Sequence, residues 1–133
     1  MNEDPELKMW LAVRQDITMP AEKLAVQSGH AFAETILRAH EADPDLVARY
    51  RATSHAKIVV RAKNLNELER VRAEAEAAGV PCTFIVDEGR TIFNEPTATV
   101  CAFGPSLRGD LPAFLRRLRV METKPKPTEE PIA

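Results

Sequence analysis

The sequence predicts an α/β fold: a three-layer sandwich with a mixed, mostly parallel four-stranded sheet and helices on both faces. Strand-like and helix-like segments alternate along most of the chain, which is the order typical of α/β proteins. The strand-like segments are short runs of large and β-branched apolar residues, as in strands that are buried on both faces. The first two connections are each long enough to hold a helix and return the chain to a parallel strand.

The first segments predict a strand followed by a long helix. Residues 8–15 (KMWLAVRQ) are dense in apolar residues and predict a central strand. Pro20 suits the first turn of a helix, where its missing N–H has no intrahelical partner, and Glu22 complements the helix dipole. We expect this helix to run to about His40, with a short helix or turn over residues 45–51.

The next segments repeat the pattern of strand and helix. Residues 57–62 (KIVVRA) predict a second strand. Asn64 and Glu67 have the spacing of a capping box, which predicts a helix start. Gly79 and then Pro81 follow in the order typical of a helix end.

The last part of the chain predicts two strands and a short helix. Residues 82–86 and 97–103 have the composition of strands. The loop of residues 87–96 is short enough for the final strand to run antiparallel to the third. A last helix is expected over residues 110–118. Residues 122–133 hold too little apolar surface to pack and predict a mobile tail.

Length and composition fit one domain, expected over residues 1–121. No apolar run approaches the roughly 18 residues of a membrane-spanning helix, and the acidic N-terminus is unlike a signal peptide. We therefore expect a cytoplasmic protein without membrane contact. Cys82 and Cys101 lack the spacing of a zinc site or a disulfide framework and are interpreted as small core residues. No metal or cofactor is expected.

The net charge of −2 disfavours a large nucleic-acid interface, because proteins that bind phosphates usually carry a surplus of lysine and arginine. Any contact with RNA must therefore come from a local basic face. The candidates are Arg90, Arg108, Arg116, Arg117 and Arg119. The alternative for the last three is an ordinary solvated helix face.

Polar residues recur along one stripe of the first predicted helix. Lys23, Gln27, His30 and Glu34 fall within this stripe at about 100° per residue. The opposite face and its flank are apolar or small: Leu24, Ala25, Val26, Ser28, Phe32, Ala33, Ile36 and Leu37. The stripe is either a solvated face with an i,i+4 pair between His30 and Glu34 or part of a site.

The loop that begins at Asp87 is a second candidate. Asp87 ends a buried strand, and ligands of open α/β sheets lie beyond the carboxyl ends of the strands. Gly89 permits a tight turn, and Arg90 could pair with a phosphate or a carboxylate. The alternative is ordinary turn chemistry. Since the first helix starts beyond the same sheet edge, Lys23 and Asp87 could approach each other.

Four segments together resemble the second, archaeal and eukaryotic type of peptidyl-tRNA hydrolase, or a bacterial relative of it. They are VRQDITMPAEKLAVQSGHA (13–31), AKIVV (56–60), DEGRT (87–91) and TATVCAFGP (97–105). The resemblance covers roughly residues 8–120 with the elements in order. It implies hydrolysis of the ester bond between peptide and tRNA, which recycles tRNA, with peptidyl-tRNA as partner. It also implies a homodimer, although no stripe in the sequence identifies an interface.

The resemblance implies roles for individual residues. The lysine, the loop aspartate and the loop threonine of the family pattern correspond to Lys23, Asp87 and Thr91, which are therefore expected to be catalytic. Further site members, expected to bind substrate, are Gln27, His30, Arg90 and Thr99. Gly104 and Pro105 match a structural turn after the last strand.

The chain departs from the family pattern just before Lys23. Pro20, Ala21 and Glu22 stand where glycines and another lysine are common, and Glu95-Pro96 replaces a Pro-Gly or similar pair. A carboxylate beside Lys23 lowers the local positive potential. The alternative function is therefore a non-catalytic binding module of the same fold that acts on a protein or a small ligand.

Overall fold

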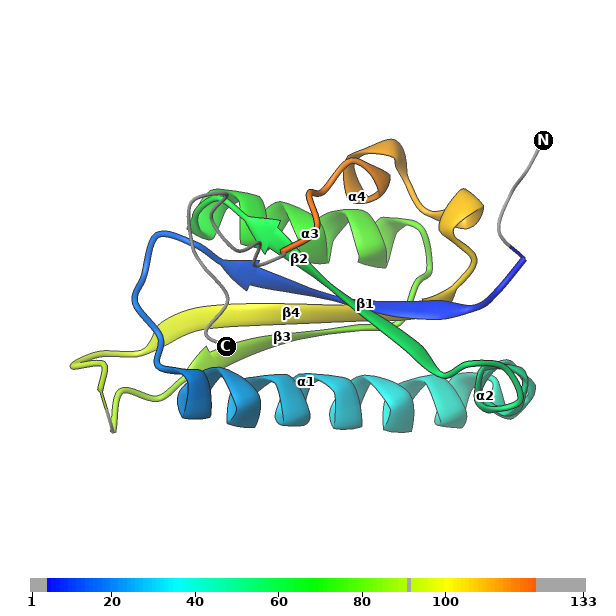
Figure 1. The fold of residues 1–133 in the computed structure, drawn as a ribbon, viewed down its shortest axis with the longest axis horizontal. Helices are drawn as coiled ribbons and strands as arrows, with labels where there is room; N and C mark the ends of the chain where they lie inside the picture. Colours follow the sequence, from blue (N-terminus) through cyan, green and yellow to red (C-terminus); the bar gives the residue numbers. More distant parts are fainter. Residues whose placement is uncertain (1–4, 91, 122–133) are drawn as a thin grey trace, which may run out of the picture.

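A computed structural model describes residues 5–90 and 92–121 of the chain. Its elements form three layers, with the sheet in the middle (Figure 1). Helix α1 (Ala21–Ala42) covers one face of the sheet, with α2 (Pro44–Arg51) at its end. Helices α3 (Leu65–Ala77) and α4 (Ala113–Arg116) cover the other face. The predicted α/β class is confirmed.

The sheet has the strand order β2-β1-β4-β3. The strands are β1 (Lys8–Arg14), β2 (Ala56–Ala62), β3 (Cys82–Asp87) and β4 (Thr97–Ser106). β1 pairs with β2 in parallel, whereas β4 runs antiparallel to both β1 and β3. Three strands therefore share one direction and the last strand lies reversed between two of them, because its short link to β3 allows only an antiparallel return.

β1 lies in the centre of the core. Its five middle residues are buried, as expected for a strand with helices on both sides. Trp10 stacks on Phe103 with 5.5 Å between the ring centroids, and only 5% of its surface is exposed. Trp10 is therefore a core residue and not a platform for a base.

Local signals fix the starts of α2 and α3. The Asn64 side chain accepts a hydrogen bond from the Glu67 N–H at 3.0 Å, and the Glu67 carboxylate accepts one from the Lys63 N–H at 2.7 Å. These bonds confirm the predicted capping pattern at α3. Asp43 separates α1 from α2 and accepts a hydrogen bond from the Leu46 N–H at 3.2 Å.

The prediction of one helix over residues 110–118 is wrong. The structure has a 3-10 turn at Arg108–Asp110 and a short α4 that ends at Arg116. Pro112 lies between them and disfavours helical geometry at the preceding Leu111, which is extended (φ −79°, ψ 145°). The proline therefore divides the expected helix.

β4 is longer than predicted. Gly104 and Pro105 lie within β4 and not in a turn after it. Gly104 has a φ of 123°, and a Cβ there would lie 2.8 Å from the Lys8 carbonyl oxygen. The register between β1 and β4 also shifts between Lys8 and Trp10. The glycine therefore lets β4 continue through this irregularity.

The described chain ends beside β2. Val120 forms an isolated antiparallel bridge with Val60, and the Met121 N–H donates to the Val59 carbonyl oxygen at 2.8 Å. The predicted tail, residues 122–133, lies outside the described residues. No helix within residues 5–90 and 92–121 is long and apolar enough to cross a membrane.

Candidate active site

An ion pair joins the first turn of α1 to the end of β3. Lys23 Nζ and Asp87 Oδ2 lie 2.5 Å apart, although 64 positions separate the two residues in the sequence. Both side chains are largely enclosed, with 15% of the Lys23 side chain and 7% of the Asp87 side chain exposed. The shared sheet edge therefore brings them together, as the proposed topology predicts.

Lys23 lies in the first turn of α1, where a positive charge destabilises an isolated helix. The N-terminal end of a helix carries partial positive charge, which repels a cation. α1 begins after Pro20 without a side-chain cap, and the Leu24 N–H bonds to the Pro20 carbonyl oxygen at 2.9 Å. Asp87 supplies the negative charge that stabilises the Lys23 ammonium group there. The pair thus depends on tertiary structure and not on helix propensity.

A tight turn holds the Asp87 carboxylate. The Gly89 N–H donates to Asp87 Oδ1 at 2.8 Å, while Lys23 binds the other oxygen. Gly89 has a φ of 83°, and a Cβ there would lie 2.7 Å from the Glu95 carbonyl carbon. The Lys23 hydrogen bond lowers the pKa of Asp87 below its ordinary value of 3.8, the Gly89 N–H lowers it further, and burial opposes both. Asp87 is therefore an anion at neutral pH.

A buried polar pair lies next to the ion pair. The Thr99 hydroxyl donates to Gln27 Oε1 at 2.7 Å, and both residues are buried. Gln27 lies one helical turn after Lys23, and Thr99 lies on β4 beside the end of β3. This hydrogen bond fixes α1 against the sheet close to Lys23.

The interpretation of the polar stripe as one solvated face is wrong. Gln27 is buried and Lys23 mostly enclosed, whereas His30 and Glu34 are exposed. Glu34 pairs with Arg38 at 3.0 Å instead of with His30. The face of α1 that is buried consists of residues at i,i+4 spacing: Gln27, Ala31, Thr35 and Ala39.

Small residues on this buried face let α1 lie close to the sheet. Thr35 donates its hydroxyl to the Ala31 carbonyl oxygen, and its oxygen lies 2.7 Å from the hydroxyl of Thr83 on β3. Sequence reasoning missed Thr35 and Thr83. Four residues of the expected apolar side are instead exposed, namely Ala25, Val26, Ala33 and Leu37.

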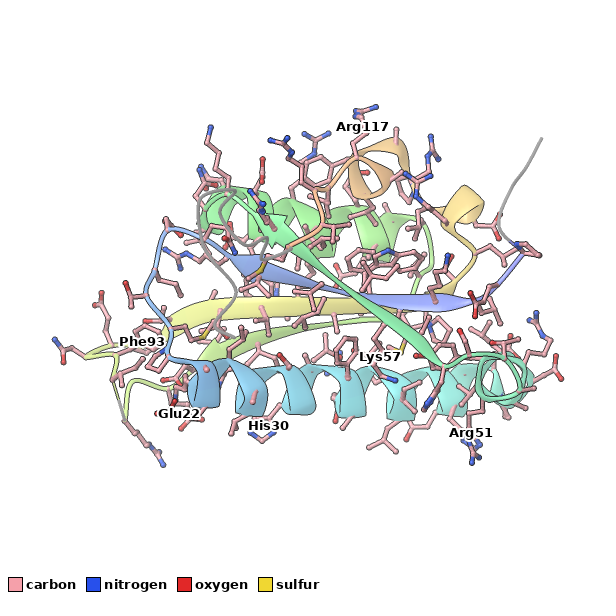
Figure 2. All side chains as sticks on the ribbon, viewed as in Figure 1. Glu22, His30, Arg51, Lys57, Phe93 and Arg117 are labelled. Carbon is pink, nitrogen blue, oxygen red and sulfur yellow. The ribbon has the colours of Figure 1, made fainter. Side chains whose placement is uncertain are left out.

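Two expected site residues, His30 and Arg90, are not brought to the ion pair. His30 points away from the sheet on the outer side of α1 (Figure 2). Arg90 is 84% exposed and pairs with Glu88 at 3.1 Å. Thr91 lies outside the described residues. Glu22 is exposed and forms no ion pair with any residue that the structure describes, so it does not compete directly for Lys23.

The fold and the site define a small α/β protein in which a paired cation and carboxylate lie at the carboxyl edge of a mixed sheet. Such a pair suits chemistry at a polarised carbonyl group. The described residues contain no cluster of three or more potential metal ligands.

Comparison with known proteins places the chain in one family. The pattern of the peptidyl-tRNA hydrolase PTH2 family matches residues 7–121. A peptidyl-tRNA hydrolase of Methanocaldococcus jannaschii is 33% identical over 99 residues, which cover 74% of this chain and 86% of the relative. One from Halobacterium salinarum is 36% identical over 116 residues, which cover 81% of this chain and 100% of the relative. The chain belongs to the peptidyl-tRNA hydrolase PTH2 family.

Some relatives are longer than the matched region. A probable peptidyl-tRNA hydrolase 2 of Schizosaccharomyces pombe is 37% identical over 100 residues, which cover 75% of this chain and 49% of the relative. The match therefore spans about half of that protein. The hydrolase names of these relatives do not favour the alternative of a non-catalytic binding module.

Proposed function

We propose that the protein hydrolyses the ester bond between peptide and tRNA in peptidyl-tRNA and so releases tRNA for reuse. The observation that carries this proposal is the enclosed Lys23–Asp87 pair, 2.5 Å between charged atoms, in a member of the PTH2 family. A cytoplasmic location is part of the proposal, because peptidyl-tRNA forms where ribosomes translate.

In the proposed reaction, water is the nucleophile. Its oxygen bonds to the ester carbonyl carbon, the bond from that carbon to the ribose oxygen breaks, and a proton passes to the ribose oxygen. The products are a free peptide carboxylate and tRNA with a free hydroxyl group, and the second proton of the water passes to solvent. An ester is more reactive than an amide, so water that is held and polarised suffices as nucleophile.

Each site residue has a proposed part in this reaction. Asp87 remains ionised, so it can align the water and accept its proton. The Lys23 ammonium group stabilises the negative charge that develops on the carbonyl oxygen. Thr91 positions the water or the ribose hydroxyl, a role that rests on the family resemblance. Gln27 and Thr99 hold α1 in place, and His30 and Arg90 contact more distant parts of the substrate.

The first prediction tests these roles with an N-acetyl-aminoacyl-tRNA substrate. Lys23→Ala and Asp87→Asn should each lower the rate of hydrolysis on the order of 100-fold or more, as does the loss of a single electrostatic group in other enzymes. Arg51→Ala is the control, because Arg51 is exposed at the opposite end of α1, as Figure 2 shows. Circular dichroism checks that the variants remain folded. Hydrolysis at the wild-type rate by Lys23→Ala would refute the assignment.

We also propose a homodimer that uses the outer side of α1. Val26 and Leu37 are 54% and 61% exposed, and their spacing of eleven residues, about three turns, puts them on one side of the helix. Exposed apolar groups on one face favour association with another apolar surface. A second copy supplies the same face by symmetry.

A further inference from the structure

A groove with a positively charged rim lies on the face of the sheet opposite α1. It has a volume of about 540 Å³ and lies between the end of β2, the start of α3 and the segment around α4. Phe114 and Leu118 form its apolar part, and Arg61, Lys63, Arg117 and Arg119 supply its positive charge. Figure 2 shows Arg117 pointing outward beside α4. We call this feature the basic groove.

The cations of the basic groove differ from most other described arginines, which have an acidic partner, a hydrogen bond to a backbone carbonyl oxygen or a contact with an aromatic ring. The ion-paired arginines are Arg14, Arg38, Arg49, Arg70 and Arg90. Arg108 and Arg116 donate hydrogen bonds to backbone carbonyl oxygens, and Arg72 lies over the Phe84 ring.

Among residues 5–90 and 92–121, a few positive side chains have no hydrogen bond, ion pair or ring contact. They are Arg51, Arg61, Lys63, Arg117 and Arg119. All except Arg51 line the basic groove. The groove also contains Glu67, but its carboxylate caps α3 by accepting the Lys63 N–H. In a chain with a net charge of −2, four of the five unpartnered cations among the described residues thus lie in one place.

The basic groove and the Lys23–Asp87 pair lie toward the same end of the sheet. Arg61 lies near the carboxyl end of β2 and Lys63 directly follows that strand, while Asp87 ends β3. β2 and β3 are the two edge strands with β1 and β4 between them. Three strand spacings separate β2 from β3, a distance of roughly 15 Å across the sheet. A substrate a few nucleotides long can therefore reach from one site to the other.

We propose that the basic groove binds phosphate groups of the tRNA backbone at a distance from the ester, while the ester occupies the Lys23–Asp87 site. This inference rests on the proposed function. Guanidinium groups pair well with phosphate oxygens, and a row of exposed cations without acidic partners is complementary to a row of phosphates. Contacts to phosphates carry no base preference, which suits an enzyme that must accept many tRNAs.

The test removes two groove charges and compares the result with a control of equal charge. The groove variant is Arg117→Ala/Arg119→Ala, and both side chains are exposed, so folding should be preserved. The control is Arg49→Ala/Arg51→Ala on α2, which changes the net charge by the same amount. The dissociation constant for deacylated tRNA is measured with each protein at several salt concentrations.

The groove variant should bind deacylated tRNA at least tenfold more weakly than the control at low salt. Each lost phosphate contact should also lower the slope of log K against log salt by roughly 0.7 to 0.9. With N-acetyl-aminoacyl-tRNA, KM should rise while kcat stays unchanged. With an N-acetyl-aminoacyl ester of adenosine, which is too small to reach the groove, the variant should match wild type.

The outcomes separate this inference from the proposed function. If the groove variant binds tRNA as the control does, or if the groove prefers polyglutamate to tRNA, the inference is overturned even when hydrolysis proceeds. If wild type cleaves neither ester, the proposed function fails. The tRNA affinities of the groove variant and the control then still show whether the basic groove binds tRNA. Lys23→Ala should lose hydrolysis of both esters and keep the wild-type affinity for tRNA.

Discussion

At the scale of single residues, the site depends on groups that are unfavourable until the fold brings them together. Lys23 lies at the helix end that repels cations, and Asp87 is a largely enclosed carboxylate. Each side chain supplies the charge that the other requires. Gly89 adds an N–H that fixes the second carboxylate oxygen. The site is therefore held in position before a substrate arrives.

This pairing predicts a particular dependence of stability on pH. The folded pKa of Asp87 lies below its ordinary value of 3.8, so the stabilisation by the pair is present above that pH. It is lost as the pH falls from about 4 through the lowered pKa. Lys23→Ala removes the largest cause of the shift. Urea denaturation between pH 6 and pH 2 should show the difference between wild type and Lys23→Ala shrinking below about pH 4. A difference that stays constant would contradict this.

Gly89 offers a test of the turn that carries Asp87. Gly89→Ala should lower hydrolysis by up to about 100-fold, since a displacement on the order of 1 Å has that effect in other active sites. The cause is the contact of 2.7 Å that a Cβ would make with Glu95. Gly79→Ala is a matched control, because Gly79 also has a positive φ, 72°, but open space around it. The control should lose about 1 to 2 kcal/mol of stability and keep its activity. Equal activity in both variants would argue against a role of the turn.

At the scale of elements, α1 determines how the site is built. Its buried face combines two alanines with Gln27 and Thr35, so the helix lies close to β3 and β4. This close approach places Lys23 within reach of Asp87. The side chains on this face are small and partly polar. Larger side chains would push the helix away from the sheet.

A pair of alanine substitutions tests this close approach. Ala31→Leu should destabilise the protein by about 1–3 kcal/mol, because Ala31 is fully buried against the sheet and has no room for a larger side chain. It should also lower hydrolysis by moving Lys23. Ala73→Leu, at an exposed position of α3 away from the proposed dimer face, should change stability by about 0.5 kcal/mol or less. Thermal or urea unfolding measures both, and equal destabilisation would show that α1 does not pack tightly.

The bounds of α1 could be predicted from sequence, but its orientation could not. Pro20 indicated the helix start, and the helix ends within two residues of the expected His40. Ala31, Thr35 and Ala39 are small, so the buried face leaves no stripe of large apolar residues in the sequence, and Gln27 was grouped with the polar side chains of the opposite stripe. Gln27 is buried with its side-chain oxygen accepting a hydrogen bond from Thr99, 72 positions later in the sequence. Such a partner is visible only in the folded chain.

The helix expected over residues 110–118 was also predicted incorrectly from the sequence, for a different reason. The apolar residues after Asp110 predicted a helix, but Pro112 stops helical geometry before α4 begins.

The approach of Lys23 and Asp87 was predictable, because crossovers that return parallel strands bring their carboxyl ends to one edge. The basic groove was not, because Arg61 and Arg119 are distant in sequence and meet only where residues 119–121 run beside β2.

At the scale of the whole molecule, net charge conceals how the charges are distributed. Ion pairs neutralise arginines on α1, α2 and α3, and four of the five described lysines and arginines that have no hydrogen bond, ion pair or ring contact line the basic groove. The weakly acidic composition therefore does not exclude RNA contact. It restricts that contact to one surface.

The proposed dimer belongs to this scale and has its own test. Wild type should show about twice the 14.8 kDa mass of one chain in light scattering. Val26→Asp/Leu37→Asp should shift it to the monomer, because a carboxylate is costly to bury at an interface. Val86→Asp, another exposed apolar position at 48%, should leave the mass unchanged. A wild-type monomer would exclude the dimer.

The reversed strand β4 has a consequence for a protein that is itself made as a peptidyl-tRNA. Within the described part of the chain β3 pairs only with β4, so a nascent chain that has reached Gly89 already contains Lys23 and Asp87 but has no strand to attach β3 to the rest of the sheet. The two charged groups can meet stably only after β4, which ends at Ser106, has been synthesised and inserted. The order of synthesis therefore makes the Lys23–Asp87 pair one of the last parts of the fold to be completed.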